Sequence, residues 1–328
     1  MKKALVLGAG GFIGNHLVTY LRKRGYWVKG IDLKEPDFFP THANEFIIAD
    51  LREQQVYRDH FHDHFDEVYQ LAADMGGAGY IFTGESDFDI VHNSAMINLN
   101  VLKACIEHRV DKVFFSSSAC VYPSHNQNST TDPDCSENSV YPANPDSEYG
   151  WEKLFSERLY QSAERNYNLN IRIARFHNIY GPGNVYDNGK EKAPAALCRK
   201  IALAENGGEV EIWGDGKQTR SFLYIDDCLD AINLLMNSDH TEPINIGSEE
   251  LIAINDLAAM IAEISNKKVL LKHVEGPQGV RGRVSNNEAI QSILGWQPKI
   301  SLYHGFENTY NWISKKMNVE PVVNSVST

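Results

Sequence analysis

The sequence predicts an α/β fold, in which a doubly wound parallel sheet is followed by a smaller C-terminal α/β lobe. Three observations lead to this prediction. Short apolar segments alternate with amphipathic segments of helical length through the first half of the chain. A glycine-rich turn, GAGGFIG, joins the first apolar segment to the first amphipathic one. Beyond residue 180 the sequence consists of short segments separated by glycine and proline, as expected where a second lobe begins.

The predicted strands are continuous apolar runs, because the strands of a parallel sheet are buried on both faces. They cover residues 3–8, 26–32, 45–50, 67–73, 112–118 and 170–176. Amphipathic helices supply the right-handed crossovers between these strands. The helices cover residues 12–24, 86–108 and 147–167.

The second half of the chain returns once to the pattern of the first. A strand–helix pair covers 221–236 and a strand covers 243–247. We therefore expect a first lobe of residues 1–176 plus 221–247 and a second lobe of residues 177–220 plus 248–317. Residues 318–328 show little periodicity, which predicts a frayed tail.

The composition argues against several classes of protein. A formal charge of −12 disfavours nucleic-acid binding, which needs a basic face to displace counterions. Five cysteines without a CxxC pair indicate neither a disulfide framework nor a metal site, and they favour the reducing cytoplasm. No apolar run reaches the length of a membrane span, so we expect no membrane partner.

The glycine-rich turn predicts a Rossmann-type dinucleotide site. Gly8, Gly11 and Gly14 lie between a strand and a helix, where the backbone must approach a pyrophosphate at the helix N-terminus. Asp32 ends the next strand, where its carboxylate can accept hydrogen bonds from ribose hydroxyls and would repel a 2′-phosphate. NAD is therefore favoured over NADP. Asp50, followed by Leu51, either contacts the adenine or caps a helix.

The motif YGWEK places Tyr149 and Lys153 on one face of a predicted helix, since the two residues are four positions apart. A nearby ammonium, together with the positive charge of an oxidised nicotinamide, would stabilise tyrosinate. Tyr149 could then take the proton from a substrate hydroxyl as hydride leaves carbon.

The run FSSSACVYP places Cys120 just after a predicted strand end. Together with the glycine turn and YGWEK, it resembles the extended short-chain dehydrogenase/reductase superfamily, whose members mostly act on nucleotide sugars. The resemblance implies a glutamate at position 120 in 4,6-dehydratases and a small residue in 4-epimerases. A thiol at this position either exchanges protons with carbon or is an inert buried residue, and the run alone leaves both open.

Longer matches resemble the GDP-mannose 3,5-epimerase family over essentially the whole folded chain. They are LAADMGGAGYI (71–81), SSACVYP (117–123), YGWEKLFSE (149–157), RFHNIYGP (175–182), EKAPAALCRK (191–200), WGDGKQTRSF (213–222), PINIGS (243–248) and GVRGR (279–283). This resemblance implies that Cys120 and Lys192 exchange protons on opposite faces of the sugar ring. It also implies that Tyr149 and Lys153 serve the hydride step, with Ser118 positioning the C4 oxygen.

The same resemblance implies a set of binding residues. For NAD we expect Gly8, Gly11, Phe12, Ile13, Gly14, Asp32, Asp50, Leu51, Leu71, Ala72, Ala73, Tyr149 and Lys153. For a GDP-sugar we expect Gly77, Ser118, Asn178, Glu191, Lys192, Lys200, Gln218, Thr219, Arg220 and Arg281. His177 has no visible partner, and we interpret it as a structural histidine. The two long helices, residues 86–108 and 147–167, are those that the superfamily pairs in homodimers, so we expect a homodimer.

The chemistry itself calls for this combination of residues. A C–H bond of a sugar is too weakly acidic for any side chain, but a ketone at C4 acidifies the hydrogens at C3 and C5. One base and one acid on opposite ring faces then exchange the proton, and each contributes roughly 10²- to 10⁴-fold. Returning the hydride regenerates NAD, so the net reaction is an isomerisation.

The sequence departs from the family's pattern at two places, and two alternative functions stay open. Gly189–Lys190 stands where the family has glycine–arginine, and Ala78 where it has methionine. Epimerisation at C3, C5 or both, and mannose or a heptose as the sugar, therefore stay undecided. A GDP-4-keto-6-deoxymannose epimerase/reductase that consumes NADPH is the first alternative, and Asp32 argues against it. A catalytically silent nucleotide-sensing Rossmann protein is the second.

Overall fold

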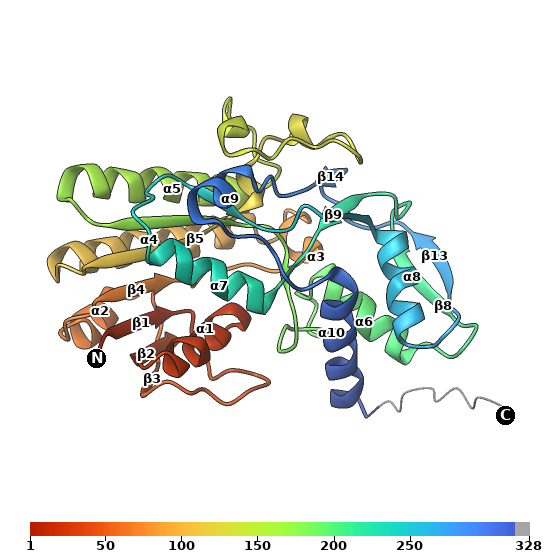
Figure 1. The fold of residues 1–328 in the computed structure, drawn as a ribbon, viewed down its shortest axis with the longest axis horizontal. Helices are drawn as coiled ribbons and strands as arrows, with labels where there is room; N and C mark the ends of the chain where they lie inside the picture. The colour runs from red at the N-terminus through yellow and green to blue at the C-terminus, as the bar shows by residue number, and fades with distance from the viewer. Residues whose placement is uncertain (319–328) are drawn as a thin grey trace.

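The centre of the computed structural model, which describes residues 1–318, is a seven-stranded sheet in which neighbouring strands are parallel. The spatial order is β11-β6-β5-β4-β1-β2-β3, so the order in which strands are added to the sheet reverses between β1 and β4; Figure 1 labels β1 to β5 of this sheet. The strands are β1 Lys3–Leu7, β2 Trp27–Asp32, β3 Glu45–Ile48, β4 Glu67–Gln70, β5 Lys112–Ser118, β6 Ile171–Phe176 and β11 Ile244–Ile246. The predicted doubly wound parallel sheet is confirmed.

Helices cover both faces of this sheet because consecutive side chains of a strand point to opposite faces and those on both faces are apolar. On β1, Ala4 and Val6 pack into the core beneath α1 and α7, whereas Leu5 and Leu7 pack into the core beneath α2, α4 and α5 (Figure 1). The helices are α1 Phe12–Lys23, α2 Gln54–His60, α4 Asp87–Glu107, α5 Glu148–Tyr167 and α7 Ile225–Met236. The sequence did not predict α2, which has only two turns.

The smaller lobe is built from short elements around three small sheets. In one of them β9 lies between β12 and β14, and the other two pair β8 with β13 and β7 with β10. The strands of these three sheets are β7 Ile179–Tyr180, β8 Glu209–Trp213, β9 Thr219–Ser221, β10 Leu223–Tyr224, β12 Leu251–Ala253, β13 Leu270–Val274 and β14 Gly282–Arg283. Its helices are α6 Ala193–Leu203, α8 Ile254–Ile264, α9 Glu288–Leu294 and α10 Leu302–Lys316, while α3 Ala78–Ile81 follows β4.

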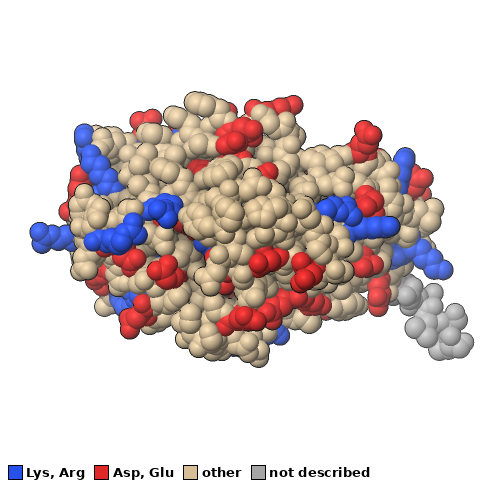
Figure 2. All heavy atoms as spheres, turned by 90° about the horizontal axis from the view of Figure 1, so that it is seen from above, with Lys and Arg blue, Asp and Glu red and all other residues tan. Residues whose placement is uncertain are grey.

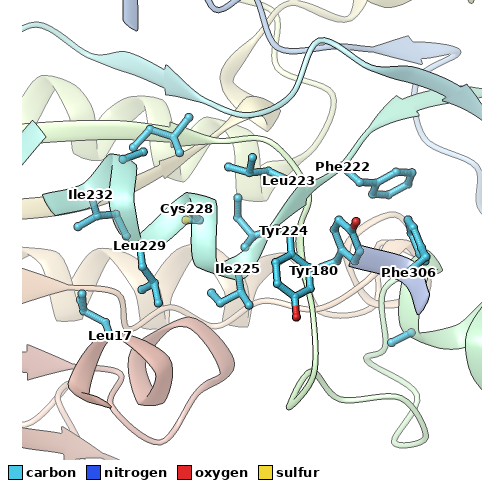
Figure 3. Close-up of a cluster of buried hydrophobic side chains, with 14 of the residues drawn as sticks. Leu17, Tyr180, Phe222, Leu223, Tyr224, Ile225, Cys228, Leu229, Ile232 and Phe306 are labelled. Carbon is cyan, nitrogen blue, oxygen red and sulfur yellow. The ribbon is translucent and has the colours of Figure 1, made fainter. Parts of the chain in front are cut away.

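One apolar core continues from the sheet into the smaller lobe. Leu17 of α1 and Ile232 of α7 lie at one end of the cluster, and Phe306 of α10 lies at the other (Figure 3). Between them Tyr180 stacks on Phe306, with ring centroids 4.4 Å apart and planes 18° apart. Because the two parts share this core, they pack as one body around the space between them. The division at the bounds predicted above stays a prediction, and all but residue 318 of the predicted tail lies outside the described residues.

The surface reflects the negative net charge. On the face seen in Figure 2, acidic side chains gather over the middle while lysines and arginines lie toward both ends. Among the described residues, no helix combines the length and the apolar character needed to cross a membrane.

Candidate active site

A cavity of about 1100 Å³ opens at the carboxyl ends of the parallel strands, between the sheet and the smaller lobe. It lies where the strand order reverses, the place at which open α/β sheets bind ligands. Every residue expected to bind the dinucleotide lines this cavity, and so do all five expected catalytic residues. The structure therefore brings residues from 8 to 192 of the chain to one space.

The glycine turn fits a dinucleotide. A Cβ on Gly14 would lie 2.0 Å from the carbonyl oxygen of Gly8, so only glycine lets the start of α1 pack on the end of β1. The N-terminus of α1 consequently faces the cavity and can receive a pyrophosphate. Asp32 accepts a hydrogen bond from the Gly10 amide at 2.9 Å, which holds its carboxylate at the cavity wall. Burial raises the pKa of Asp32, and this amide partly opposes the effect.

Asp50 lines the cavity, but it does not cap a helix, since the residue that precedes α2 is Glu53. The Asp50 carboxylate is bound by Arg52, whose Nε lies 2.9 and 3.0 Å from the two oxygens. This hydrogen bonding from Arg52 lowers the pKa of Asp50. The negative charge of Asp50 is thus already paired beside the predicted adenine position.

Cys120 occupies a short 3₁₀ turn, Ala119–Val121, directly after β5. The Ser118 Oγ accepts a hydrogen bond from the Cys120 amide at 3.2 Å and so caps this turn. The start of α5 packs directly on it, since a Cβ on Gly150 would lie 2.2 Å from the Cys120 carbonyl oxygen. The thiol is 9% exposed, and it lines the cavity. These contacts fix the Cys120 backbone at the end of a central strand.

Arg283 is the functional candidate that sequence reasoning missed. Its Nη1 donates to the Cys120 Sγ at 3.2 Å, its Nη2 pairs with Asp146 at 2.6 Å, and its Nε donates to the Gln127 Oε1 at 2.6 Å. Burial by itself would lower the pKa of Arg283, but the charges of Asp146 and Cys120 raise it above the ordinary value. A permanent cation therefore lies against the sulfur and can stabilise negative charge on it. Arg283 ends the block GVRGR, from which the resemblance implied only Arg281 as a binding residue.

Tyr149 and Lys153 project from the first turns of α5 into the cavity. The Lys153 Nζ donates to the Ser116 carbonyl oxygen at 2.8 Å and lies 5.7 Å from the centroid of the Tyr149 ring. Burial raises the pKa of Tyr149 above its ordinary value, and a hydrogen bond with the Ser118 side chain opposes this in part. Burial also lowers the pKa of Lys153. That the ammonium, together with the charge of an oxidised nicotinamide, stabilises tyrosinate stays a prediction.

Lys192 reaches the cavity from the smaller lobe, where it is the residue that precedes α6. Burial lowers the pKa of Lys192, while the charge of Cys120 acts in the opposite direction. Its segment packs on the turn after β4: the Gly77 amide donates to the Lys190 carbonyl oxygen at 2.9 Å, and a Cβ on Gly77 would lie 2.1 Å from the Glu191 carbonyl oxygen. The thiol and the ammonium thus enter one cavity from different elements.

The residues expected to bind the GDP-sugar divide into two groups. Two of them, Thr219 and Arg281, are not among the cavity-lining residues. The Thr219 hydroxyl donates to the Thr130 carbonyl oxygen at 2.7 Å, and Arg281 pairs with Asp215 at 3.0 Å. The others line the cavity: Gly77, Ser118, Asn178, Glu191, Lys192, Lys200, Gln218 and Arg220.

Two of the lining residues carry a buried polar or charged group that a bound ligand could stabilise. The Gln218 Oε1 is buried without a hydrogen-bond partner, although its Nε2 donates to the Trp213 carbonyl oxygen at 3.0 Å. Burial lowers the pKa of Arg220 to about 10, and the nearby charge of Arg283 acts in the same direction. A ligand that carries a negative charge and a hydrogen-bond donor could pair with Arg220 and donate to the Gln218 Oε1.

His177 is a structural histidine, as interpreted from the sequence. Its side chain is fully buried, and its Nε2 lies 2.9 Å from the Asn245 Oδ1. Burial lowers the pKa of His177 to about 3. It is not among the residues that line the cavity.

Comparison with known proteins places this geometry in context. The model of the NAD dependent epimerase/dehydratase family matches residues 4–247. The GDP-mannose 3,5-epimerase of Arabidopsis thaliana is 40% identical over 320 residues, which cover 97% of this chain and 84% of that protein. The GDP-L-fucose synthase of Escherichia coli strain K12 is 26% identical over 95% of this chain and 96% of that protein.

Solved structures show the same architecture. A UDP-glucose 4-epimerase of Thermotoga maritima with UDP-glucose superposes with a TM-score of 0.85 at 27% identity, covering 96% of this chain and 99% of that one. A UDP-glucuronic acid 4-epimerase of Bacillus cereus in complex with UDP-glucuronic acid and NAD superposes with a TM-score of 0.80 at 28% identity, with the same coverage.

Proposed function

Because the chain belongs to the NAD dependent epimerase/dehydratase family, we propose that its substrate is GDP-mannose and that it inverts C–H centres of the mannose ring. It is an NAD-dependent nucleotide-sugar epimerase, an isomerase. The proposed substrate rests on the 40% identity to the Arabidopsis GDP-mannose 3,5-epimerase. The roles that we assign to individual residues are argued from their positions in the cavity.

The observation that carries the proposal is the pairing of Cys120 with Arg283 in a cavity that also receives Lys192. A 4-epimerase that only removes and returns a hydride needs no base beside the ring other than its tyrosine. A thiol held against a permanent cation, with an ammonium on a different element, supplies what C–H exchange requires.

The glycine turn and Asp32 would hold NAD, which when bound would supply a reversible two-electron oxidation at C4 of the sugar. The chain's own groups handle the protons. Tyr149 takes the proton of the C4 hydroxyl and later returns it, while Ser118 orients that oxygen. Lys153 is anchored to the Ser116 carbonyl oxygen and keeps the start of α5 against the strand end.

Cys120 and Lys192 then exchange protons with the carbons next to the ketone. The sulfur, on which Arg283 can stabilise negative charge, removes a proton from one ring face, and the Lys192 ammonium delivers a proton to the other. The C–H bond that breaks leaves its electron pair in the enolate, and the new C–H bond takes that pair back. The configuration inverts because the proton leaves and arrives on opposite faces.

The GDP portion is held by the cavity wall of the smaller lobe. Arg220 and Lys200 provide positive charge for the pyrophosphate, and the unpartnered Gln218 Oε1 accepts a hydrogen bond from a hydroxyl or an N–H group of the nucleotide. Glu191 accepts from the Gly189 amide at 2.6 Å and pairs with Arg199 at 3.3 Å, which orders the segment beside the sugar.

The test is incubation of the purified protein with GDP-mannose in D₂O, followed by NMR of the sugar. Deuterium at C3 and C5, with NAD retained and not consumed, supports the proposal. Label at one carbon alone restricts the reaction to that centre. Unchanged, unlabelled GDP-mannose overturns the proposed substrate. Net oxidation of NADPH with a 4-keto-6-deoxy sugar would favour the epimerase/reductase chemistry, which Asp32 disfavours.

We also propose that the protein is a homodimer that pairs α4 and α5 with those of a second copy. Large apolar side chains project from these two helices into solvent, which is unusual for a helix face without a partner. They are Phe88, Met96, Leu99, Trp151 and Phe155, with exposed fractions of 76%, 36%, 45%, 43% and 50%. Light scattering behind a sizing column tests this, and Phe155→Arg should give monomers.

A cytoplasmic location is the last part of the proposal. All five cysteines are free and buried, as suits a reducing compartment.

A further inference from the structure

Lys190 lies in an exposed stretch of the loop that leads into α6, two residues before Lys192. Its Nζ is 3.6 Å from the Asp74 Oδ1 and 3.7 Å from the centroid of the Tyr80 ring. The Tyr80 hydroxyl donates to the same Asp74 oxygen at 2.9 Å. The ammonium therefore bridges a carboxylate and an aromatic face, both of which follow β4.

Asp74 is itself anchored. Its second oxygen accepts from the Asn93 Nδ2 at 2.9 Å, and its amide donates to the Ser94 Oγ at 3.1 Å, so it is tied to α4. Asn93 in turn accepts from the Arg52 Nη1 at 3.0 Å. A continuous set of polar contacts thus runs from the end of β3 through α4 to the loop that carries Lys192.

The backbone of this loop has little freedom to shift while these contacts hold. The Gly77 amide binds the Lys190 carbonyl oxygen at 2.9 Å, and the Glu191 carbonyl oxygen fills the place of a Cβ on Gly77. On the other side Glu191 pairs with Arg199 of α6. Lys192 follows directly and is the last residue before α6, so its position depends on the conformation of residues 189–191.

We propose that Lys190 is a positioning residue for the reaction: its contacts with Asp74 and Tyr80 latch the loop onto the first lobe and hold the Lys192 ammonium at the sugar ring. The proposal rests on the proposed function for the role of Lys192, whereas the latch itself rests only on the contacts above. An isolated exposed ion pair contributes little to stability. A displacement of about 1 Å at a reacting group, however, lowers a rate by as much as roughly 10²-fold.

The latch is tested without substrate by hydrogen exchange. In Lys190→Met, peptides that cover residues 185–195 should take up deuterium faster than in the wild type, and peptides from β5 should not change. Lys190→Arg keeps the charge and should restore slow exchange. The control is Lys272→Met, which removes an exposed lysine paired with Glu209 at 3.2 Å, outside the cavity. Unchanged exchange in Lys190→Met overturns the latch.

The positioning role is tested by kinetics on the same variants. Lys190→Met should lower kcat for deuterium incorporation between about 10- and 100-fold while KM stays within about threefold. Asp74→Asn combined with Lys190→Met should be no slower than Lys190→Met alone, because both changes remove one contact.

The outcomes that contradict the positioning role are distinct. A rise in KM with unchanged kcat would assign Lys190 to substrate binding. Additive losses of kcat in the double variant would show that Lys190 and Asp74 act independently. Either result overturns the proposal. If the wild type itself fails to turn over GDP-mannose, the proposed function fails, while the exchange experiment still decides whether the latch exists.

Discussion

The Cys120 sulfur and the Arg283 guanidinium lie 3.2 Å apart, although 163 residues separate them in the chain. Asp146 and Gln127 hold the remaining donors of Arg283, so the guanidinium cannot turn away from the sulfur without breaking buried hydrogen bonds. Leaving such donors unpaired costs about 1–3 kcal/mol each. The Cys120 thiol is thus one part of a charged arrangement that buried hydrogen bonds hold in place.

Replacing the sulfur should stop C–H exchange. In Cys120→Ala we expect kcat for deuterium incorporation to fall by roughly 10²- to 10⁴-fold, the contribution of one well-placed proton-transfer group. The NMR assay in D₂O measures this. Cys120→Ser keeps the size of the side chain but not the acidity, and it should also be slow. Turnover in Cys120→Ala equal to that of the wild type would remove Cys120 from the mechanism.

Removing the cation should make the thiol less nucleophilic. In Arg283→Met we expect iodoacetamide to alkylate Cys120 about tenfold more slowly at pH 7, since a hydrogen bond to a charged group contributes about 1.5 kcal/mol or more. Peptide mass mapping with time gives the rate. Arg281→Met is the matched control, because its guanidinium pairs with the exposed Asp215.

The alkylation should be selective for Cys120. Burial raises the pKa of Cys135 to about 11 and raises the pKa of each of the three other cysteines, which are inaccessible as well: Cys105, Cys198 and Cys228. Equal rates in Arg283→Met and the wild type would mean that the contact does not activate the sulfur.

The pH dependence should reveal Lys192. Burial lowers the pKa of Lys192 below the ordinary 10.5, and only the protonated amine can deliver a proton. As the pH rises through this lowered pKa, the ammonium is lost and kcat/KM should fall, so the alkaline limb lies below pH 10.5. Lys192→Met should lose the limb together with roughly 10²- to 10⁴-fold in rate. A profile that stays flat up to pH 10.5 would contradict this role.

Stability at mildly acidic pH should depend on His177. Its pKa is about 3 in the folded protein against 6.5 for an exposed histidine, so the unfolded chain binds the proton more readily between these values. Stability present above pH 6.5 is therefore lost as the pH falls, by about 2 kcal/mol between pH 6.5 and pH 5. Urea unfolding across this range should show a smaller decline for His177→Gln. Parallel declines in the two proteins would contradict the prediction.

Cofactor choice should depend on Asp32. Without its carboxylate, the ribose hydroxyls lose hydrogen bonds to a charged group, each contributing about 1.5–3 kcal/mol. Asp32→Ser should therefore bind NAD at least roughly tenfold more weakly, and its preference for NAD over NADP should shrink. Calorimetric titration with both dinucleotides measures this. Unaltered discrimination would mean that another residue faces the ribose.

The parts of the fold that the sequence predicted are those fixed by local patterns. Apolar runs located the strands of the large sheet, and the GAGGFIG turn located the dinucleotide end of the cavity. The short elements of the smaller lobe escaped prediction, because segments such as β14, two residues long, carry no periodicity of their own. The conformation of β14 is set by its pairing with β9.

At the site, the sequence reached its limit for the same reason: the positions of some residues depend on parts of the chain that are distant in sequence. Thr219 and Arg220 are neighbours on β9, and neighbouring strand residues point to opposite faces. Thr219 therefore points away from the face of Arg220, but the sequence predicted no strand at these residues. Arg283 left no signal in the sequence, since its partners come from loops far away in the chain. The pKa of Tyr149 depends on burial, which no spacing of residues reveals.

The contact between Cys120 and Arg283 joins residues that are 163 positions apart in the chain, and this affects biosynthesis. During translation, Cys120 leaves the ribosome long before the guanidinium that contacts it. A nascent chain that ends before Arg283 therefore carries the thiol without its cation, and the charged pair can form only after residue 283 has been added.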